Sequence, residues 1–169
     1  MKFKNAHNIY FIGIGGIGMS ALALYFNKLG KNVAGYDKVS SEITKNLENS
    51  GIRIHFEDRI DLIPNEFKNK ENTLVVLTPA VPRTHSESSY FKQNNFDVFK
   101  RSEVLGEITE DTFCLAVAGT HGKTTTSTIL GHIFKEANTN ATSFLGGISE
   151  NYNSNLILGG DKISIVEAD

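Results

Sequence analysis

The stretch "YFIGIGGIGMSALA", Tyr10–Ala23, places a glycine-rich turn between a short apolar run and an amphipathic segment. The apolar run is typical of a strand buried on both faces. After the turn, apolar residues recur at helical spacing from Ile17 to Leu29, and Gly30 stands where a C-terminal cap belongs. Strand, turn and helix in this order predict the first unit of a doubly wound α/β fold.

The glycines of this turn follow the pattern G-x-G-x-x-G. Gly13 permits the tight turn, Gly15 lets the backbone approach a diphosphate, and Gly18 lets the helix pack closely on the strand. A diphosphate would then meet free N–H groups and the positive end of the helix dipole. Asp37, at the end of the next predicted strand, is placed to accept hydrogen bonds from ribose hydroxyls. The pattern predicts a nucleotide diphosphate without saying which one.

A secretory signal is the alternative interpretation of the same stretch. Lys2 and Lys4 precede the apolar residues, and "ALA" near residue 23 looks like a cleavage site. Each glycine in the turn would weaken a signal helix by up to about 1 kcal/mol relative to alanine. We therefore expect a cytoplasmic protein without membrane insertion, and no other segment is long enough to span a bilayer.

Strand and helix patterns alternate through the first hundred residues. Further strands are predicted at 32–37, 52–56, 72–78 and 96–100, and further helices at 40–51, 86–95 and 102–108. This alternation predicts a parallel sheet with helices on both faces.

A second glycine turn, "GTHGKTTT", follows the apolar run 112–119 and precedes a helix predicted over 126–137. Backbone N–H groups of such a loop wrap phosphates, Lys123 reaches the terminal ones, and the Thr124 hydroxyl is suited to Mg²⁺. The loop departs from the common spacing because Val117 stands where the first glycine would fall. Two more strands are predicted at 140–147 and 162–169, the latter carrying Glu167 as a candidate Mg²⁺ contact.

The predicted architecture is a Rossmann-like doubly wound parallel sheet in residues 1–105, followed in residues 106–169 by the beginning of a P-loop ATP-binding α/β domain. The helix over 126–137 should turn Ile129, Leu130, Ile133, Phe134 and Ala137 to one face. We expect the second domain to be truncated and its small sheet to leave an edge or an apolar face uncovered.

Composition excludes several classes of protein. The 169 residues carry a net charge of −2 with no basic run, which excludes an electrostatic footprint for nucleic acid or an anionic membrane. Cys114 is the single cysteine, so there is no internal disulfide, and its apolar surroundings predict that it is buried. His7, His55, His85 and His132 lack metal-ligand spacing and are interpreted as surface or packing residues.

With both turns considered together, the sequence resembles the Mur ligases, the ATP-dependent enzymes that build the peptide stem of peptidoglycan. The segments "HNIYFIGIGGIGMSALA" and "VAGTHGKTTT" resemble the alanine-adding branch, and "VVLTPAVP" and "KRSEVLGEI" are also similar to family segments. Two segments depart from the family. Thr78 and Pro79 stand where relatives often carry two serines, and "IHFED" lacks a glycine–histidine pair common there.

The resemblance implies ATP-dependent ligation of L-alanine to the lactyl carboxylate of UDP-N-acetylmuramate through an acyl phosphate, in the synthesis of cell-wall precursors needed for cell shape and division. It implies ATP and Mg²⁺ as cofactors, the two substrates as partners, and a fragment inactive by itself; a homo-oligomer is left open. The implied catalytic residue is Lys123, and the implied metal contacts are Thr124 and Glu167. The implied ATP-binding residues are Gly119, Thr120, His121, Gly122, Lys123, Thr124 and Thr125. The implied UDP-sugar-binding residues are Gly13, Gly15, Gly16, Ile17, Gly18, Met19, Ser20, Asp37 and Thr78.

Two other functions are compatible with parts of the sequence. An NAD-binding dehydrogenase or sensor module fused to a P-loop domain would use Asp37 but would not explain "GTHGKTTT". A regulatory nucleotide-binding module without chemistry is the other alternative.

Overall fold

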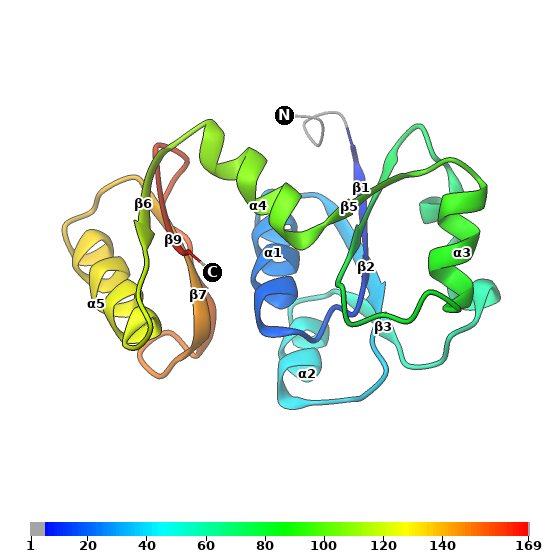
Figure 1. The fold of residues 1–169 in the computed structure, drawn as a ribbon, viewed down its shortest axis with the longest axis horizontal. Coiled ribbons are helices and arrows are strands. Elements are labelled where there is room, and N and C mark those ends of the chain that lie inside the picture. Colours follow the sequence, from blue (N-terminus) through cyan, green and yellow to red (C-terminus); the bar gives the residue numbers. More distant parts are fainter. Residues whose placement is uncertain (1–5, 169) are drawn as a thin grey trace. The chain divides into compact units, whose positions relative to one another are not determined.

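The computed structural model describes residues 6–168, and the chain divides into two units, residues 1–104 and 105–169. Each unit contains one sheet, and the two sheets share no strand (Figure 1). The predicted fold class, an α/β protein whose first sheet is parallel and doubly wound, is confirmed.

Unit 1 is built on five parallel strands in the order β3-β2-β1-β4-β5. The strands are β1 (Asn8–Ile12), β2 (Asn32–Tyr36), β3 (Arg53–His55), β4 (Thr73–Leu77) and β5 (Asp97–Lys100). The helices are α1 (Ile17–Lys28), α2 (Glu42–Asn49), α3 (Ser86–Gln93) and α4 (Arg101–Glu110), the last of which continues into unit 2. Because the strand order reverses between β1 and β4, their carboxyl ends form the topological switch point where such sheets bind ligands.

The central strand β1 is buried along its whole length, as its apolar sequence predicts. Tyr10 and Ile12 belong to a core cluster that includes Phe67 and Phe91. Phe11, pointing the opposite way, packs against Phe26 of α1 with ring centroids 6.5 Å apart. The segment considered above as a secretory signal therefore forms the middle of this unit.

Between β3 and β4 the chain forms two short 3₁₀ helices, η2 (Ile60–Leu62) and η3 (Asn65–Lys68). The sequence patterns did not predict them, since they are too short to show a helical period. Among the helices within residues 6–168, none has both the length and the apolar composition that crossing a bilayer requires.

Unit 2 contains a mixed four-stranded sheet in the order β6-β9-β7-β8. Its elements are β6 (Phe113–Val117), α5 (Lys123–Glu136), β7 (Ala141–Ser149), β8 (Ser154–Ile157) and β9 (Ile163–Glu167). β6 and β7 both pair in parallel with β9, whereas β8 pairs antiparallel with β7. β8 was not predicted. Helix α5 lies on β7 through Gly131, where a Cβ atom would come 2.6 Å from the Ser143 hydroxyl oxygen.

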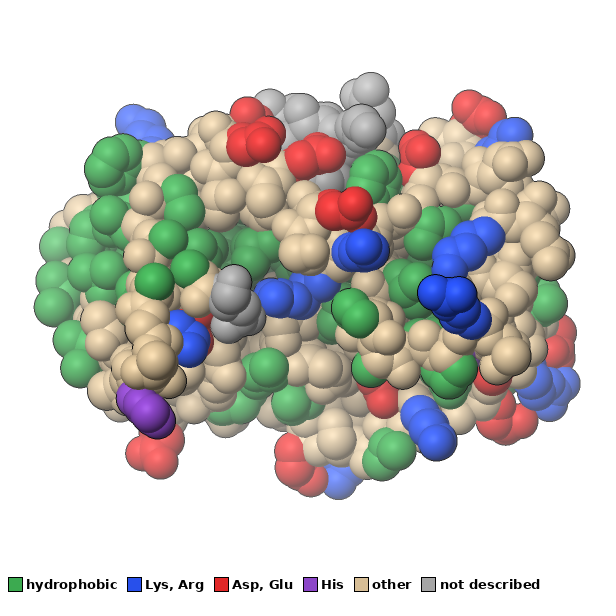
Figure 2. Space-filling view, in the orientation of Figure 1, with side chains coloured by type: hydrophobic (Ala, Val, Ile, Leu, Met, Phe, Trp, Pro, Cys, Tyr) green, Lys and Arg blue, Asp and Glu red, His purple; other side chains and the backbone are tan. Residues whose placement is uncertain are grey.

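Two expectations about burial in unit 2 are wrong. Cys114 is exposed rather than buried, because β6 lies at the edge of the sheet and Phe113 beside it is 69% exposed. On α5, Ile129 and Ile133 are exposed, because the helix turns Ser127 and Gly131 inward instead. Figure 2 shows hydrophobic side chains gathered over the part of this unit that carries α5 and β6.

Candidate functional site

The first glycine turn joins β1 to α1 at the switch point of sheet A. Gly13 has a φ of 85°, which an L side chain rarely adopts, and its amide donates to the Tyr36 carbonyl at 2.8 Å. Helix α1 begins at Ile17, and its N-cap residue Gly16 carries no side chain to cap the first turn. The turn therefore presents the N-terminal end of a helix, the arrangement that favours an anion.

Asp37 holds this turn in place from the end of β2. Its Oδ2 accepts the Gly15 amide at 2.7 Å, and its Oδ1 accepts the Val39 amide at 3.1 Å. A Cβ atom at Gly15 would lie 2.9 Å from Oδ2 of Asp37 and 2.9 Å from Cγ2 of Thr44. A side chain at position 15 would therefore displace Asp37 and Thr44, in addition to blocking any approach of a diphosphate.

Gly18 makes room for a side chain from α4. A Cβ atom there would lie 2.8 Å from Cδ of Arg101 and 2.9 Å from its Nη1. The sequence predicted that Gly18 lets α1 pack closely on a strand. In the structure, the space beside Gly18 is occupied by the Arg101 side chain instead. A guanidinium group thus lies next to the first turn of α1.

A pocket of about 450 Å³ opens beside the turn at the carboxyl ends of β1, β2 and β4. Its lining residues are Gly13, Gly15, Gly16, Tyr36, Asp37, Lys38, Val39, Ser41, Thr78, Ala80, Val81, Pro82 and His85. Five of the predicted sugar-nucleotide residues, Gly13, Gly15, Gly16, Asp37 and Thr78, are therefore brought together. Ile17, Gly18, Met19 and Ser20 are not in this lining, and the side chains of Met19 and Ser20 are buried on α1.

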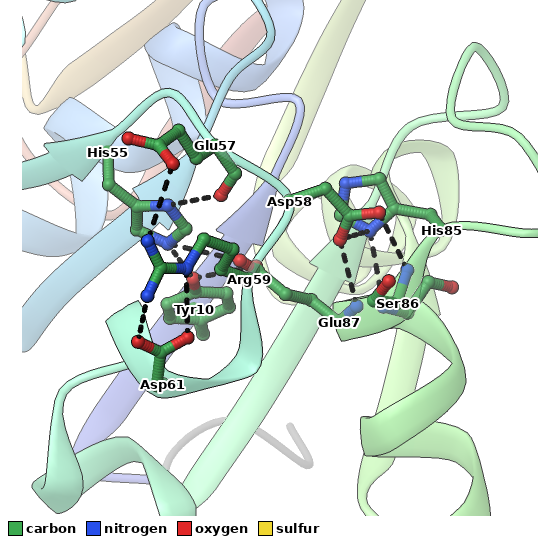
Figure 3. A network of polar contacts seen from close by, with 10 residues as sticks. Tyr10, His55, Glu57, Asp58, Arg59, Asp61, His85, Ser86 and Glu87 are labelled. Carbon is green, nitrogen blue, oxygen red and sulfur yellow. Dashed lines mark hydrogen bonds and ion pairs between the residues drawn. The ribbon is translucent and has the colours of Figure 1, made fainter.

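The sequence interpretation missed a polar network beside this pocket, drawn in Figure 3. Asp58 accepts the amides of Ser86 at 2.9 Å and Glu87 at 3.2 Å, so it caps the first turn of α3. Burial acts to raise the pKa of Asp58, but these backbone hydrogen bonds outweigh it and hold the pKa below its ordinary value. The carboxylate of Asp58 is therefore ionised at neutral pH.

Glu87 is fully buried in the same network. The Tyr10 hydroxyl donates to its Oε2 at 2.8 Å, and Nε2 of His55 lies 3.2 Å from its Oε1 and 2.8 Å from the Tyr10 oxygen. Burial raises the pKa of Glu87 to about 7 and lowers the pKa of His55. Tyr10, His55 and Glu87 thus form a hydrogen-bonded group in which the Glu87 carboxyl has its pKa near neutral pH.

His85 belongs both to the network and to the pocket wall. Its ring packs edge-on against Tyr36 with centroids 4.5 Å apart, and its Nδ1 lies 3.2 Å from Oδ1 of Asp58. Burial lowers the pKa of His85, so the ring is neutral at pH 7. The signal that could have located His85 is its position in the loop between β4 and α3, which begins at the switch point of the predicted sheet.

The second glycine turn precedes α5 in unit 2. Gly122 is the N-cap and has a left-handed φ of 77°, and Gly119 has a φ of 147°. The Lys123 ammonium folds back over the loop and donates to the Gly119 carbonyl at 2.9 Å. Thr120, His121 and Thr125, also predicted here, are exposed. The loop, the lysine and the helix end therefore converge as predicted for a phosphate-binding turn.

Glu167, at the end of β9, lies against the start of α5. Its Oε2 accepts the Thr124 hydroxyl at 3.1 Å, and its Oε1 accepts the Ser127 hydroxyl at 2.9 Å and the Gly146 amide at 2.8 Å. Ser127 was not predicted, although it lies three residues after Thr124 and thus on the same helical face. The two predicted metal contacts are adjacent, joined by one hydrogen bond.

These donors suit one kind of metal ion. The described residues contain no group of three or more His, Cys, Asp or Glu side chains able to hold a metal, so a closed protein cage is absent from that part of the chain. One carboxylate and one hydroxyl fit Mg²⁺, which keeps several waters and is completed by phosphate oxygens.

Comparison with known proteins shows a family. The sequence pattern of the Mur ligase family, catalytic domain, matches residues 8–112. The chain is 64% identical over 169 residues to a UDP-N-acetylmuramate–L-alanine ligase of Flavobacterium psychrophilum and 60% identical to that of Flavobacterium johnsoniae. Both alignments cover 100% of this chain, but only 38% of the first protein and 37% of the second.

Solved structures show the same similarity. The UDP-N-acetylmuramate–alanine ligase of Thermotoga maritima superposes with a TM-score of 0.83 at 30% identity, over 95% of this chain and 37% of that one. The UDP-N-acetylmuramate:L-alanyl-γ-D-glutamyl-meso-diaminopimelate ligase of Neisseria meningitidis gives a TM-score of 0.83 at 26% identity, over 97% of this chain and 53% of that one. The fold of the chain is thus that of the N-terminal part of longer ligases.

Proposed function

The chain belongs to the Mur ligase family, and from that premise we propose that it forms the N-terminal part of an ATP-dependent ligase that joins L-alanine to UDP-N-acetylmuramate. The two Flavobacterium relatives described above are named as ligases that join L-alanine to UDP-N-acetylmuramate. Because the chain spans only 37–38% of their length, the activity is proposed for the whole ligase and not for these residues alone.

We assign the UDP-sugar to the pocket of unit 1, and this pocket is the observation that carries the proposal. It lies at the switch point of a doubly wound sheet and includes Gly13, Gly15 and Gly16 of the turn that precedes α1. The diphosphate would meet backbone N–H groups at the start of α1, and the nucleoside would extend toward the end of β2 and the loop after Thr78.

We assign ATP to the turn of unit 2. The backbone of Gly119–Thr125 would surround its phosphates, and Lys123 would leave the Gly119 carbonyl to reach the terminal phosphate. Thr124 and Glu167 would hold Mg²⁺, which supplies positive charge beside the phosphates when it is bound. The hydrogen bond between the two side chains holds their oxygens 3.1 Å apart.

The proposed reaction begins with the activation of a carboxylate. The lactyl carboxylate of the sugar nucleotide takes up the terminal phosphoryl group of ATP, which gives an acyl phosphate and ADP. The neutral amine of L-alanine then attacks the acyl carbon to give a tetrahedral intermediate, which expels phosphate and loses one proton from nitrogen as the amide forms. Lys123 would neutralise charge on the phosphoryl group as it is transferred. This contact lowers the barrier because it is stronger in the transition state than in the ground state. We place this reaction in the cytoplasm, as a step of peptidoglycan synthesis.

A dehydrogenase-like module that binds NAD is the competing function. Thermal unfolding of the protein with UDP-N-acetylmuramate or with NAD separates the two. A ligand at about one hundred times its Kd should stabilise the folded state by roughly 2.7 kcal/mol. We expect stabilisation by the UDP-sugar alone. Stabilisation by NAD without any effect of the UDP-sugar would overturn the proposal.

A further inference from the structure

His85 carries a polar atom that the protein itself does not satisfy. The side chain is 5% exposed and lines the pocket of unit 1, and among the described residues its Nε2 has no hydrogen-bond partner. A buried polar atom without a partner costs about 1–3 kcal/mol, so it requires an explanation. Because His85 lines the pocket, a ligand bound there is the partner we consider for this atom.

The tautomer of His85 decides what kind of partner fits. Nδ1 lies 3.2 Å from Oδ1 of Asp58 and 3.4 Å from the amide of Ser88, and these two contacts need opposite protonation of Nδ1. The Asp58 carboxylate is ionised and held by two amides, and a hydrogen bond to a charged acceptor is about twice as strong as one between neutral groups. The proton therefore resides on Nδ1, which leaves a lone pair on Nε2.

The walls around His85 indicate which part of the ligand lies there. Val81 and Pro82 are apolar and belong to the loop after β4, and Val39 closes the pocket from the end of β2. The anion-binding end of the pocket is the glycine turn, so the neighbourhood of His85 remains for the nucleoside. A uridine offers two kinds of donor, the imide N–H of the base and the hydroxyls of the ribose.

We propose that Nε2 of His85 accepts a hydrogen bond from the nucleoside of the bound ligand, and that Asp58 positions the ring for this contact. The inference rests on the UDP-sugar site proposed above and adds a specificity-determining residue to it. If the donor is the imide N–H, the site rejects cytosine, which has an acceptor at the same ring position. If the donor is a ribose hydroxyl, the site selects for an intact ribose.

Calorimetric titration with UDP as the probe tests this role. His85→Asn keeps a side chain that is a good N-cap for α3 but removes Nε2. His7→Asn is the matched control, because His7 is exposed. We expect His85→Asn to weaken UDP binding about ten-fold, as for one lost hydrogen bond, with His7→Asn unchanged. Equal UDP affinity in His85→Asn and the wild type would overturn the proposal.

Ligand analogues identify the donor without changing the protein. N3-methyl-UDP lacks the imide N–H, and 2′,3′-dideoxy-UDP lacks both ribose hydroxyls. One of the two should bind the wild type about ten-fold more weakly than UDP, and that loss should vanish in His85→Asn. If both analogues bind as UDP does, His85 is not a nucleoside contact. If the wild type binds no UDP in any form, the proposed function fails as well, which distinguishes that failure from failure of His85 alone.

Nitrogen-15 NMR of the ring tests the positioning by Asp58. The wild type should show the proton on Nδ1, and Asp58→Asn should shift the ring toward the Nε2–H form and weaken UDP binding. A purely structural Asp58 would leave the tautomer unchanged. An Nε2–H tautomer in the wild type would also contradict the proposal.

Discussion

Replacing the buried Glu87 by glutamine should make the protein more stable than the wild type at alkaline pH. Burial places the pKa of Glu87 at about 7, against an ordinary value of 4.5. The folded state therefore holds this proton more tightly than the unfolded state does. The stabilisation from the protonated carboxyl is fully present below pH 4.5 and is lost as the pH rises toward 7.

The magnitude follows from that difference in proton affinity. Each tenfold change in proton affinity corresponds to about 1.4 kcal/mol. Raising the pKa of Glu87 from 4.5 to about 7 therefore amounts to about 3 kcal/mol. At pH 5 the carboxyl is mostly protonated in the folded state, and glutamine replaces it with a neutral group that still accepts the Tyr10 hydroxyl. At pH 8 the wild type carries a buried carboxylate and the variant does not. Glu87→Gln should thus gain up to about 3 kcal/mol relative to the wild type between these two pH values.

Urea unfolding followed by circular dichroism measures this difference at pH 5, 6, 7 and 8. The control is Glu48→Gln, the same substitution at an exposed position of α2, whose stability should stay parallel to the wild type. If the free energies of unfolding of Glu87→Gln and the wild type also change in parallel between pH 5 and 8, the reasoning about the buried carboxyl is wrong.

Three further outcomes are expected. Lys123→Ala should lower phosphate release by the full-length ligase about 10²–10³-fold with little change in UDP-sugar affinity, because the lysine lies in unit 2, and a near-normal rate would remove it from the reaction. Gly15→Val should abolish calorimetric binding of the UDP-sugar while unit 1 stays folded, since its Cβ would displace Asp37 and Thr44; undiminished binding would show that the turn is only structural. Cys114 should react with a thiol reagent as completely in the native protein as in denaturant, whereas protection in the native state would contradict its exposure.

Local sequence patterns determined most of the elements. The glycine turn after β1, the period of α1 and the glycines that follow α1 and α2 are local signals, because they report backbone conformations that few other residues adopt. The alternation of strands and helices was enough to predict a parallel sheet. Both glycine turns were found from sequence. Thr124 and Glu167, each named as a candidate Mg²⁺ contact, lie one hydrogen bond apart in the structure.

Other features depend on which residues meet across the fold. The apolar run of β6 predicted burial for Cys114, but a periodic pattern does not show whether a strand lies at the centre or the edge of its sheet. The polar network joins Tyr10, His55, Asp58 and Glu87 from three separate segments, of which only His55 and Asp58 are close in the sequence, so no local spacing predicts it. The sequence by itself determined the two glycine turns, because each is a short stretch of backbone. Only the tertiary structure placed His85 in the pocket wall, since its partner Asp58 and its neighbour Tyr36 come from distant parts of the chain.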